Sequence, residues 1–311
     1  VPFTGWAVFV AGLTIGMGPV ASAGDAMGFF ITAIPFNIYP ILSVLMVGLI
    51  ASGWLPDFGP MKEAERRAQE EGKVVRDGGE PLMADELTGI EPYEGIRTSL
   101  FWNFILPVML VIGFALVSVS LTSSAKPLEA FMLATFVLAI IMRLQGVPLN
   151  EITSTAMLGI KGIMPAVVIL AFAYALNDLS AALHTADYIV SITRSWLTPA
   201  ILPLLVFVIS GVIAFSTGTS WGTYAIMIPI SVPLAFNFSG GELSTLVYAT
   251  LAATAGGGVF GDHCSPLSDT SILASTGAAS DHIDHIKTQL PYSMVVGVIS
   301  MVAYLWLGMS L

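Results

Sequence analysis

The sequence predicts an all-α polytopic membrane protein, and three observations support this fold class. Hydrophobic residues make up 55% of the chain and charged residues only 10%, whereas soluble domains carry about a quarter charged residues. Residues 57–97 hold 6 of the 11 Lys and Arg residues and 11 of the 21 Asp and Glu residues, so long uncharged runs remain elsewhere. Those runs are too long for the alternating strands of a β-barrel, and they allow about seven to nine membrane segments of roughly 20 residues each.

Residues 1–56 are expected to hold membrane segments, as two spans or as one span and a re-entrant piece. The first apolar run covers residues 3–23. Two prolines interrupt the second run and disfavour a regular helix there. The second span is therefore expected over residues 39–54, with Asn37 at its entrance.

Residues 57–97 form one charged loop. Basic residues collect in cytoplasmic loops, so the loop is predicted to lie in the cytoplasm. Residues 63–71 have the composition of one or two helical turns, but several Gly and Pro residues follow them. A solvated connector is favoured over a regulatory domain.

Residues 98–311 supply the remaining spans, separated by charged residues or polar turns. The expected segments are 98–125, 128–146, 162–177, two crossings within 195–241, then 243–261 and 291–311.

Two Gly-rich polar stretches interrupt these spans, near residues 216–223 and 256–270. The second is expected to break its helix at the glycine triplet Gly256, Gly257 and Gly258. An unpaired peptide group is costly in hydrocarbon, so a broken helix survives where it lines a cavity or is shielded by protein. Free carbonyls and hydroxyls suit a small cation, which predicts an ion or substrate site. The alternative for the first stretch is close helix packing, because Gly218 and Gly222 have the small-xxx-small spacing.

Three aspartates are candidates for a carboxylate that binds a cation when ionised and a proton when neutral: Asp262, Asp269 and Asp178. Ionisable residues near membrane spans are commonly functional. The alternatives are solvation in an interfacial loop, a helix cap, or pairing with Lys161 or Lys287.

His263, His282 and His285 invite two further interpretations. Together with Cys264 they resemble zinc ligands, but no CxxC or HExxH pattern occurs, so no transition metal is expected. A pH-sensing role is a weak alternative, because imidazole titrates near neutrality. A solvated amphipathic turn before Pro291 is favoured. One cysteine excludes an internal disulfide, and a net charge of −10 argues against nucleic acid as a partner.

Residues 218–223 and 256–291, with support from 35–39 and 57–61, resemble the NhaC-type Na⁺/H⁺ antiporter family. The resemblance implies a secondary transporter built from inverted repeats, with its transport core in residues 98–311. Family members have more membrane segments before the point where this chain begins, so the chain is expected to be truncated within the first repeat. The cation-site residues that the resemblance implies are Thr217, Thr219, Ser220, Asp262, Ser265, Ser268 and Asp269.

The leading hypothesis is therefore a Na⁺/H⁺ antiporter that works by alternating access in the inner (plasma) membrane. The alternative is an ion-coupled carrier of an organic acid, as in malate/lactate exchange, or of an amino acid. A third and less favoured hypothesis is an intramembrane metalloenzyme. The leading hypothesis expects no enzyme activity and no cofactor. Na⁺, H⁺ and the lipid bilayer are the expected partners, and a homodimer is one option for the assembly.

Overall fold

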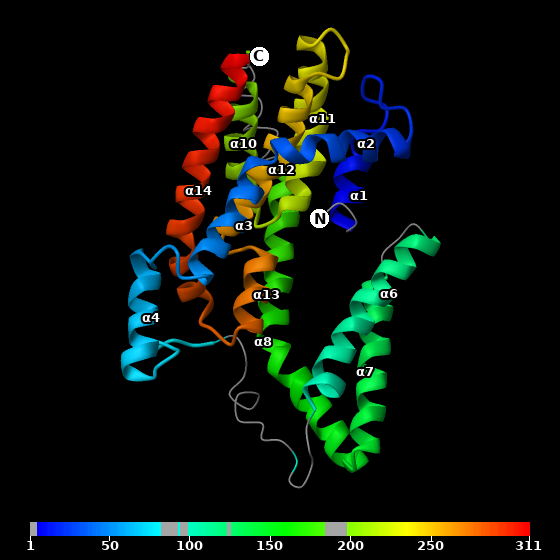
Figure 1. The fold of residues 1–311 in the computed structure, drawn as a ribbon, viewed down its shortest axis with the longest axis vertical. Coiled ribbons are helices and arrows are strands. Elements are labelled where there is room, and N and C mark those ends of the chain that lie inside the picture. The colour runs from blue at the N-terminus through cyan, green and yellow to red at the C-terminus, as the bar shows by residue number, and fades with distance from the viewer. Residues whose placement is uncertain (1–4, 82–92, 94–98, 123–125, 184–197) are drawn as a thin grey trace. The chain divides into compact units, whose positions relative to one another are not determined.

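The computed structural model describes residues 5–81, 93, 99–122, 126–183 and 198–311 (Figure 1). Within these residues the regular structure is helical, apart from an isolated antiparallel bridge between Pro81 and Asp281. The chain divides into two compact units, one of residues 1–8 and 83–165 and one of residues 9–82 and 166–311. Helices α1 (Gly5–Gly12) and α8 (Leu149–Ala182) have residues in both units.

The smaller unit contains a π-helical turn, η2 (Phe101–Ile105), followed by α6 (Leu106–Thr122) and α7 (Pro127–Leu144). Helices α6 and α7 pack against each other. The amides of Asn103 and Gln145 exchange two hydrogen bonds of 2.9 and 3.0 Å, which ties η2 to the end of α7. Helix α6 lies within the span expected over residues 98–125, and α7 matches the span expected over residues 128–146 to within two residues at each end.

The larger unit is organised around α12 (Thr245–Cys264), which packs against helices from both ends of the chain. Its neighbours are α2 (Ala23–Ala33), η1 (Ile34–Phe36), α3 (Ile38–Ala51), α10 (Leu202–Thr217), α11 (Ser220–Phe238), α13 (Asp269–Gly277) and α14 (His282–Ser310). Every residue from Ala249 to Gly258 is buried. In this unit α12 is therefore a core helix, and its small side chains let the neighbours approach closely.

The expected helix break at Gly256, Gly257 and Gly258 is wrong. All three residues lie inside α12, and the helix ends only at Cys264. A methyl group on Gly257 would collide with the backbone of α10 at Phe207, and one on Gly258 would collide with Tyr224 of α11. Each glycine costs a helix about 1 kcal/mol relative to alanine, and here the close approach of three helices offsets that cost.

The first 56 residues differ in part from the expectation. Helix α1 is only eight residues long and is followed by turns in which Gly16 and Gly18 adopt φ values of +87° and +52°. The run over residues 3–23 is therefore not one helix. The second apolar run is interrupted as expected. Asn37 separates η1 from α3, and the helix axis bends by 54° between α2–η1 and α3.

Helices α4, α8 and α14 begin well before or extend well beyond their expected bounds. Helix α8 covers Leu149–Ala182, where a span over residues 162–177 is expected. Helix α4 (Gly59–Glu71) is longer than the one or two turns expected in the charged loop. Helix α14 begins at His282 rather than Pro291, because the Asp281 side chain accepts a hydrogen bond from the Asp284 N–H and caps it. Pro291 lies inside the helix.

In the described part of the chain, three helical stretches are long and apolar enough to cross a membrane: Phe101–Ser118, α11 and α14. A fourth is present if the bent pair α2–η1 and α3 counts as one span. These helices agree with an integral membrane protein. The full number of spans and the inverted-repeat architecture stay predictions.

Candidate functional site

The two helix breaks of the larger unit lie against each other. Helix α10 ends before Gly218, whose φ of +68° turns the chain into α11. The second break covers residues 265–268, between α12 and α13. A methyl group on Gly218 would lie 2.5 Å from the carbonyl oxygen of Leu267, and the Ser265 hydroxyl donates a 2.8 Å hydrogen bond to the Phe215 carbonyl. Helix breaks are therefore present within both predicted stretches, residues 216–223 and 256–270, and the structure adds that the two breaks are in contact.

Asp262 lies in the last turn of α12, beside the second break, and is only 4% exposed. Its Oδ2 accepts a 2.7 Å hydrogen bond from the Thr270 hydroxyl, and the Ser268 hydroxyl lies 2.9 Å from the same Thr270 oxygen. The second carboxylate oxygen, Oδ1, is buried and has no hydrogen-bond partner among the described residues. Burying such an oxygen is costly unless a proton or a cation accompanies it. The interpretation of Asp262 as a solvated interfacial carboxylate is wrong.

The other predicted residues of the second break serve the backbone of that break. Ser265 ends α12, and its Oγ also accepts a hydrogen bond from the Leu267 N–H. Ser268 caps α13 by accepting a 3.2 Å hydrogen bond from the Ser271 N–H. Asp269 is the first residue of α13 and is half-buried. These contacts hold the chain in the turn that places Asp262 and Thr270 together.

The predicted residues of the first break lie at its two ends. Thr217 ends α10, and its hydroxyl donates a 2.8 Å hydrogen bond to the Ile213 carbonyl of its own helix. Thr219 precedes α11 and Ser220 begins it, and each is 7% exposed. Gly222 lies in the first turn of α11.

Asp178 lies on α8, and its side chain is outside the described residues. Gly256, the first residue of the triplet, faces the third bend of the unit, since a methyl group there would lie 2.9 Å from Asn37 Oδ1. That amide oxygen is also buried without a hydrogen-bond partner among the described residues.

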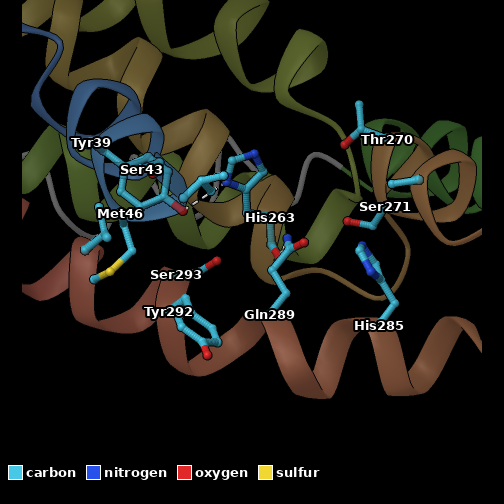
Figure 2. A pocket seen from close by; sticks show the side chains of 13 residues that line it. Tyr39, Ser43, Met46, His263, Thr270, Ser271, His285, Gln289, Tyr292 and Ser293 are labelled. Carbon is cyan, nitrogen blue, oxygen red and sulfur yellow. Dashed lines mark hydrogen bonds between the residues drawn. The ribbon is translucent and has the colours of Figure 1, made fainter. Parts of the chain in front are cut away.

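A cavity of about 290 Å³ lies between α3, the end of α12, α13 and α14 (Figure 2). Thr270 lines the cavity, and its hydroxyl donates the hydrogen bond to Asp262. This residue therefore links the cavity with the carboxylate. Across the cavity, Tyr39 Oη lies 3.0 Å from His263 Nδ1, and the Gln289 side chain donates a hydrogen bond to the His263 carbonyl. The remaining polar lining consists of Ser43, Ser271, His285, Tyr292 and Ser293.

The three candidate histidines have different surroundings. His282 is 8% exposed, with its Nε2 at 2.8 Å from the Pro266 carbonyl oxygen and its Nδ1 at 3.1 Å from the Ser275 hydroxyl. A carbonyl only accepts hydrogen bonds, so Nε2 carries a proton. The interpretation as a solvated turn is therefore wrong for His282. His263 and His285 line the cavity, and pH sensing by any of the three stays a prediction.

Seven polar residues of the cavity lining are missing from the sequence-based candidates: Tyr39, Ser43, Thr270, Ser271, Gln289, Tyr292 and Ser293. Thr270 follows Ser268 and Asp269 directly, within a motif that already stands out. Gln289 and Tyr292 lie four and seven positions after His285, which is the spacing of one helix face. That periodicity is the signal that could have found them. No pattern in the sequence indicates that α3 packs against this face of α14, as it does in the structure.

Within the described ranges, no group of three or more His, Cys, Asp or Glu side chains is placed to hold a metal ion.

Comparison with known proteins gives consistent matches. The sequence model described as the Na⁺/H⁺ antiporter family matches residues 6–309. An uncharacterized protein of Haemophilus influenzae is 32% identical over 337 residues, covering 99% of this chain and 60% of that protein. An arginine/ornithine antiporter of Halobacterium salinarum is 35% identical over 125 residues, covering 40% of this chain and 25% of that protein.

A malate-2H⁺/Na⁺-lactate antiporter of Bacillus subtilis is 25% identical over 183 residues, covering 58% of this chain and 38% of that protein. No solved structure matches the chain. The chain thus spans 60% or less of the length of these three relatives. Because the family model covers nearly the whole chain, the resemblance seen in the sequence is confirmed, and the chain belongs to the Na⁺/H⁺ antiporter family.

Proposed function

We propose that this chain forms part of a secondary antiporter that exchanges Na⁺ for H⁺, with Asp262 as the carboxylate that both ions use. The observation that carries the proposal is the buried Oδ1 of Asp262, which has no hydrogen-bond partner in the part of the chain that the structure describes and lies beside two helix breaks in contact. An ionised Asp262 is stabilised there by Na⁺, and a neutral one holds H⁺ on the same oxygen. Competition for one carboxylate makes the exchange obligatory.

The oxygens around Asp262 suit a small hard cation. The hydroxyls of Thr270 and Ser268 are next to the carboxylate, and hydroxyl and carboxylate oxygens are the ligands that such cations prefer. We propose that Asp269 and Asp178 assist, and that the polar residues of both breaks contribute ligands during the transport cycle. Those residues are Thr217, Thr219, Ser220 and Ser265.

A second cargo is favoured by one observation. The cavity of about 290 Å³ beside Asp262 is larger than a bare cation needs, and its lining offers several hydrogen-bonding side chains. Two relatives are named for exchange of arginine with ornithine and of malate with lactate. An organic acid or amino acid moved together with the cation is therefore the alternative substrate.

We further propose a setting for this activity. The protein lies in the plasma membrane as a multi-pass protein of about seven to nine segments, with residues 57–97 in the cytoplasm. Six of the eleven basic residues lie in that loop, which is what the positive-inside rule expects of a cytoplasmic loop. The broken helices belong to an inverted-repeat core, and two copies form a homodimer.

Proteoliposomes that contain the longest natural form of the chain and a pH-sensitive dye test the function. Dequenching on addition of Na⁺ or Li⁺ alone is the expected result and establishes cation/proton exchange. A response only to malate, lactate, arginine or ornithine would replace Na⁺/H⁺ exchange with the alternative cargo. Silence toward all of these additions would contradict both substrates.

A further inference from the structure

Residues 57–81, here called the lid segment, are fastened to α14 at their first end by Tyr292. The Tyr292 hydroxyl donates a 2.8 Å hydrogen bond to Asp57 Oδ1 and accepts a 3.2 Å hydrogen bond from the Phe58 N–H. The rings of Phe58 and Tyr292 also pack with their centroids 4.3 Å apart. One side chain of α14 therefore holds the start of the segment by two hydrogen bonds and a ring contact.

The other end of the lid segment is fastened to the start of α14. Arg76 Nε donates a 2.7 Å hydrogen bond to Asp284 Oδ1, and its guanidinium lies 3.8 Å from Asp281 Oδ2. The Glu80 N–H donates a 2.8 Å hydrogen bond to the same Asp281 oxygen. Both ends of the segment are thus bound to the first three turns of α14 and the residue that caps it.

Between these two ends, α4 turns one face toward α14. Met61, Ala64 and Ala68 are half-buried and follow the i, i+3, i+7 spacing of one helix face, whereas most of the charged residues of α4 are exposed. This face and α14 enclose a hollow of about 380 Å³, which His285 and Thr288 also line. Helix α4 therefore lies alongside α14, and the hollow separates part of their facing surfaces.

His285 lines this hollow and also the cavity of Figure 2. It further lines a third hollow, of about 290 Å³, together with Met61 of α4 and Tyr292. The three hollows share residues of the same α14 face. Thr270, the hydrogen-bond partner of Asp262, lines the first of these hollows, and Ala64 and Ala68 of α4 line the second.

We propose that the lid segment closes the aqueous passage to Asp262 and that its latches, Arg76 with Asp284 and Tyr292 with Asp57, set how often the passage opens. This regulation rests on the proposed function, because it controls access to the same carboxylate. Release of either latch lets α4 swing away while Tyr292, Gln289 and His285 remain on α14 as the wall of the passage.

The test measures access and needs no transport. In the longest natural form of the chain, every cysteine, Cys264 among them, is replaced by alanine, and a single thiol is then introduced by Ser271→Cys. Ser271 is 3% exposed and lines the cavity of Figure 2. Membrane vesicles are then treated with a charged, membrane-impermeant methanethiosulfonate, and the labelling rate is measured from each side.

Arg76→Ala should raise the labelling rate about 2- to 5-fold from the side that the lid segment faces, which is the opening expected from losing one partly exposed ion pair. Asp284→Asn should give a similar increase, and the double variant no more than either single one. Tyr292→Phe, which frees the other end, should add to the effect of Arg76→Ala. The matched control is Arg66→Ala, because Arg66 pairs with Glu63 and Glu70 of its own helix, and its rate should not change.

Equal labelling rates in the background protein, in Arg76→Ala and in Asp284→Asn would overturn the proposal, as would an equal increase in Arg66→Ala. Because the readout is a chemical rate, it remains valid if the protein exchanges no Na⁺. Conversely, Na⁺/H⁺ exchange with unchanged labelling would remove the lid and leave the proposed function standing.

Discussion

Substitution of Gly218 by alanine tests whether the two helix breaks are in contact. The residue adopts φ of +68°, and an added methyl group would lie 2.5 Å from the Leu267 carbonyl oxygen and 2.8 Å from the Leu267 Cβ. The carbonyl belongs to the backbone and cannot rotate away, so the second break has to move. Gly218→Ala should therefore disturb Asp262 from a distance.

Two costs add up in the loss of stability expected for Gly218→Ala. A left-handed backbone costs an alanine about 1–2 kcal/mol. Forcing two packed segments apart costs about 1–3 kcal/mol more, which gives a total of about 2–5 kcal/mol. Gly240→Ala is the matched control, because Gly240 has φ of +66° and no atom within 4 Å of an added methyl group. Gly240→Ala should therefore lose only the backbone cost of about 1–2 kcal/mol.

Thermal unfolding in detergent micelles, followed by tryptophan fluorescence, measures both variants. At about 2–4 °C per kcal/mol for a protein of this size class, Gly240→Ala should lower the apparent Tm by about 2–8 °C. Gly218→Ala should lower it by roughly twice as much or more, and should also slow Na⁺-driven exchange. Equal shifts in Tm for the two variants would refute the contact between the breaks.

Three further predictions follow from the packing and the charges. Gly257→Ala should destabilise the protein by about 1–3 kcal/mol because α10 touches this position, whereas Gly48→Ala, with open space around it, should be neutral or stabilise by up to about 1 kcal/mol in the same thermal assay. His282→Leu should cost about 1–3 kcal/mol, because it removes one hydrogen bond to the second break and one to α13, and leaves the Pro266 carbonyl without its donor; an unchanged Tm would contradict this role. Burial alone raises the pKa of Asp281, but three backbone N–H groups and the Arg76 guanidinium favour its ionised form, so its pKa lies below the ordinary 3.8. The stabilisation is therefore present above pH 3.8 and is lost as the pH falls through the lowered pKa. Hydrogen exchange of the Glu80 amide checks this, with protection that should persist down to about pH 4, and loss of protection near neutral pH would contradict it.

The sequence predicts the helical membrane class because that class depends on composition alone. It also predicts the break at Gly218, where a left-handed turn and flanking hydroxyls are both local signals. It fails at Gly256, Gly257 and Gly258, because the same glycines serve either a break or a close helix contact. Only the position of α10 and α11 decides between the two, and a single sequence does not contain that position.

At Asp262, too, the sequence supplies the local signal and the structure supplies the tertiary contacts. Asp262 stands out in the sequence as an ionisable residue near a span, and the structure adds that one of its oxygens is buried with no hydrogen-bond partner among the residues described. Thr270, its hydrogen-bond partner, follows a helix start whose position depends on where α12 ends. The cavity could not be predicted at all, because Tyr39 and Gln289 are about 250 positions apart and meet only through tertiary packing.

The most direct test of Asp262 as the carboxylate shared by Na⁺ and H⁺ is the initial rate of Na⁺-driven dequenching in proteoliposomes that contain Asp262→Asn. Glu242→Gln is the matched control, since it also neutralises a carboxylate, in an exposed loop. We expect no exchange in Asp262→Asn, with the protein folded and inserted, and the wild-type rate in Glu242→Gln. A wild-type rate in Asp262→Asn would contradict the assignment of the shared carboxylate.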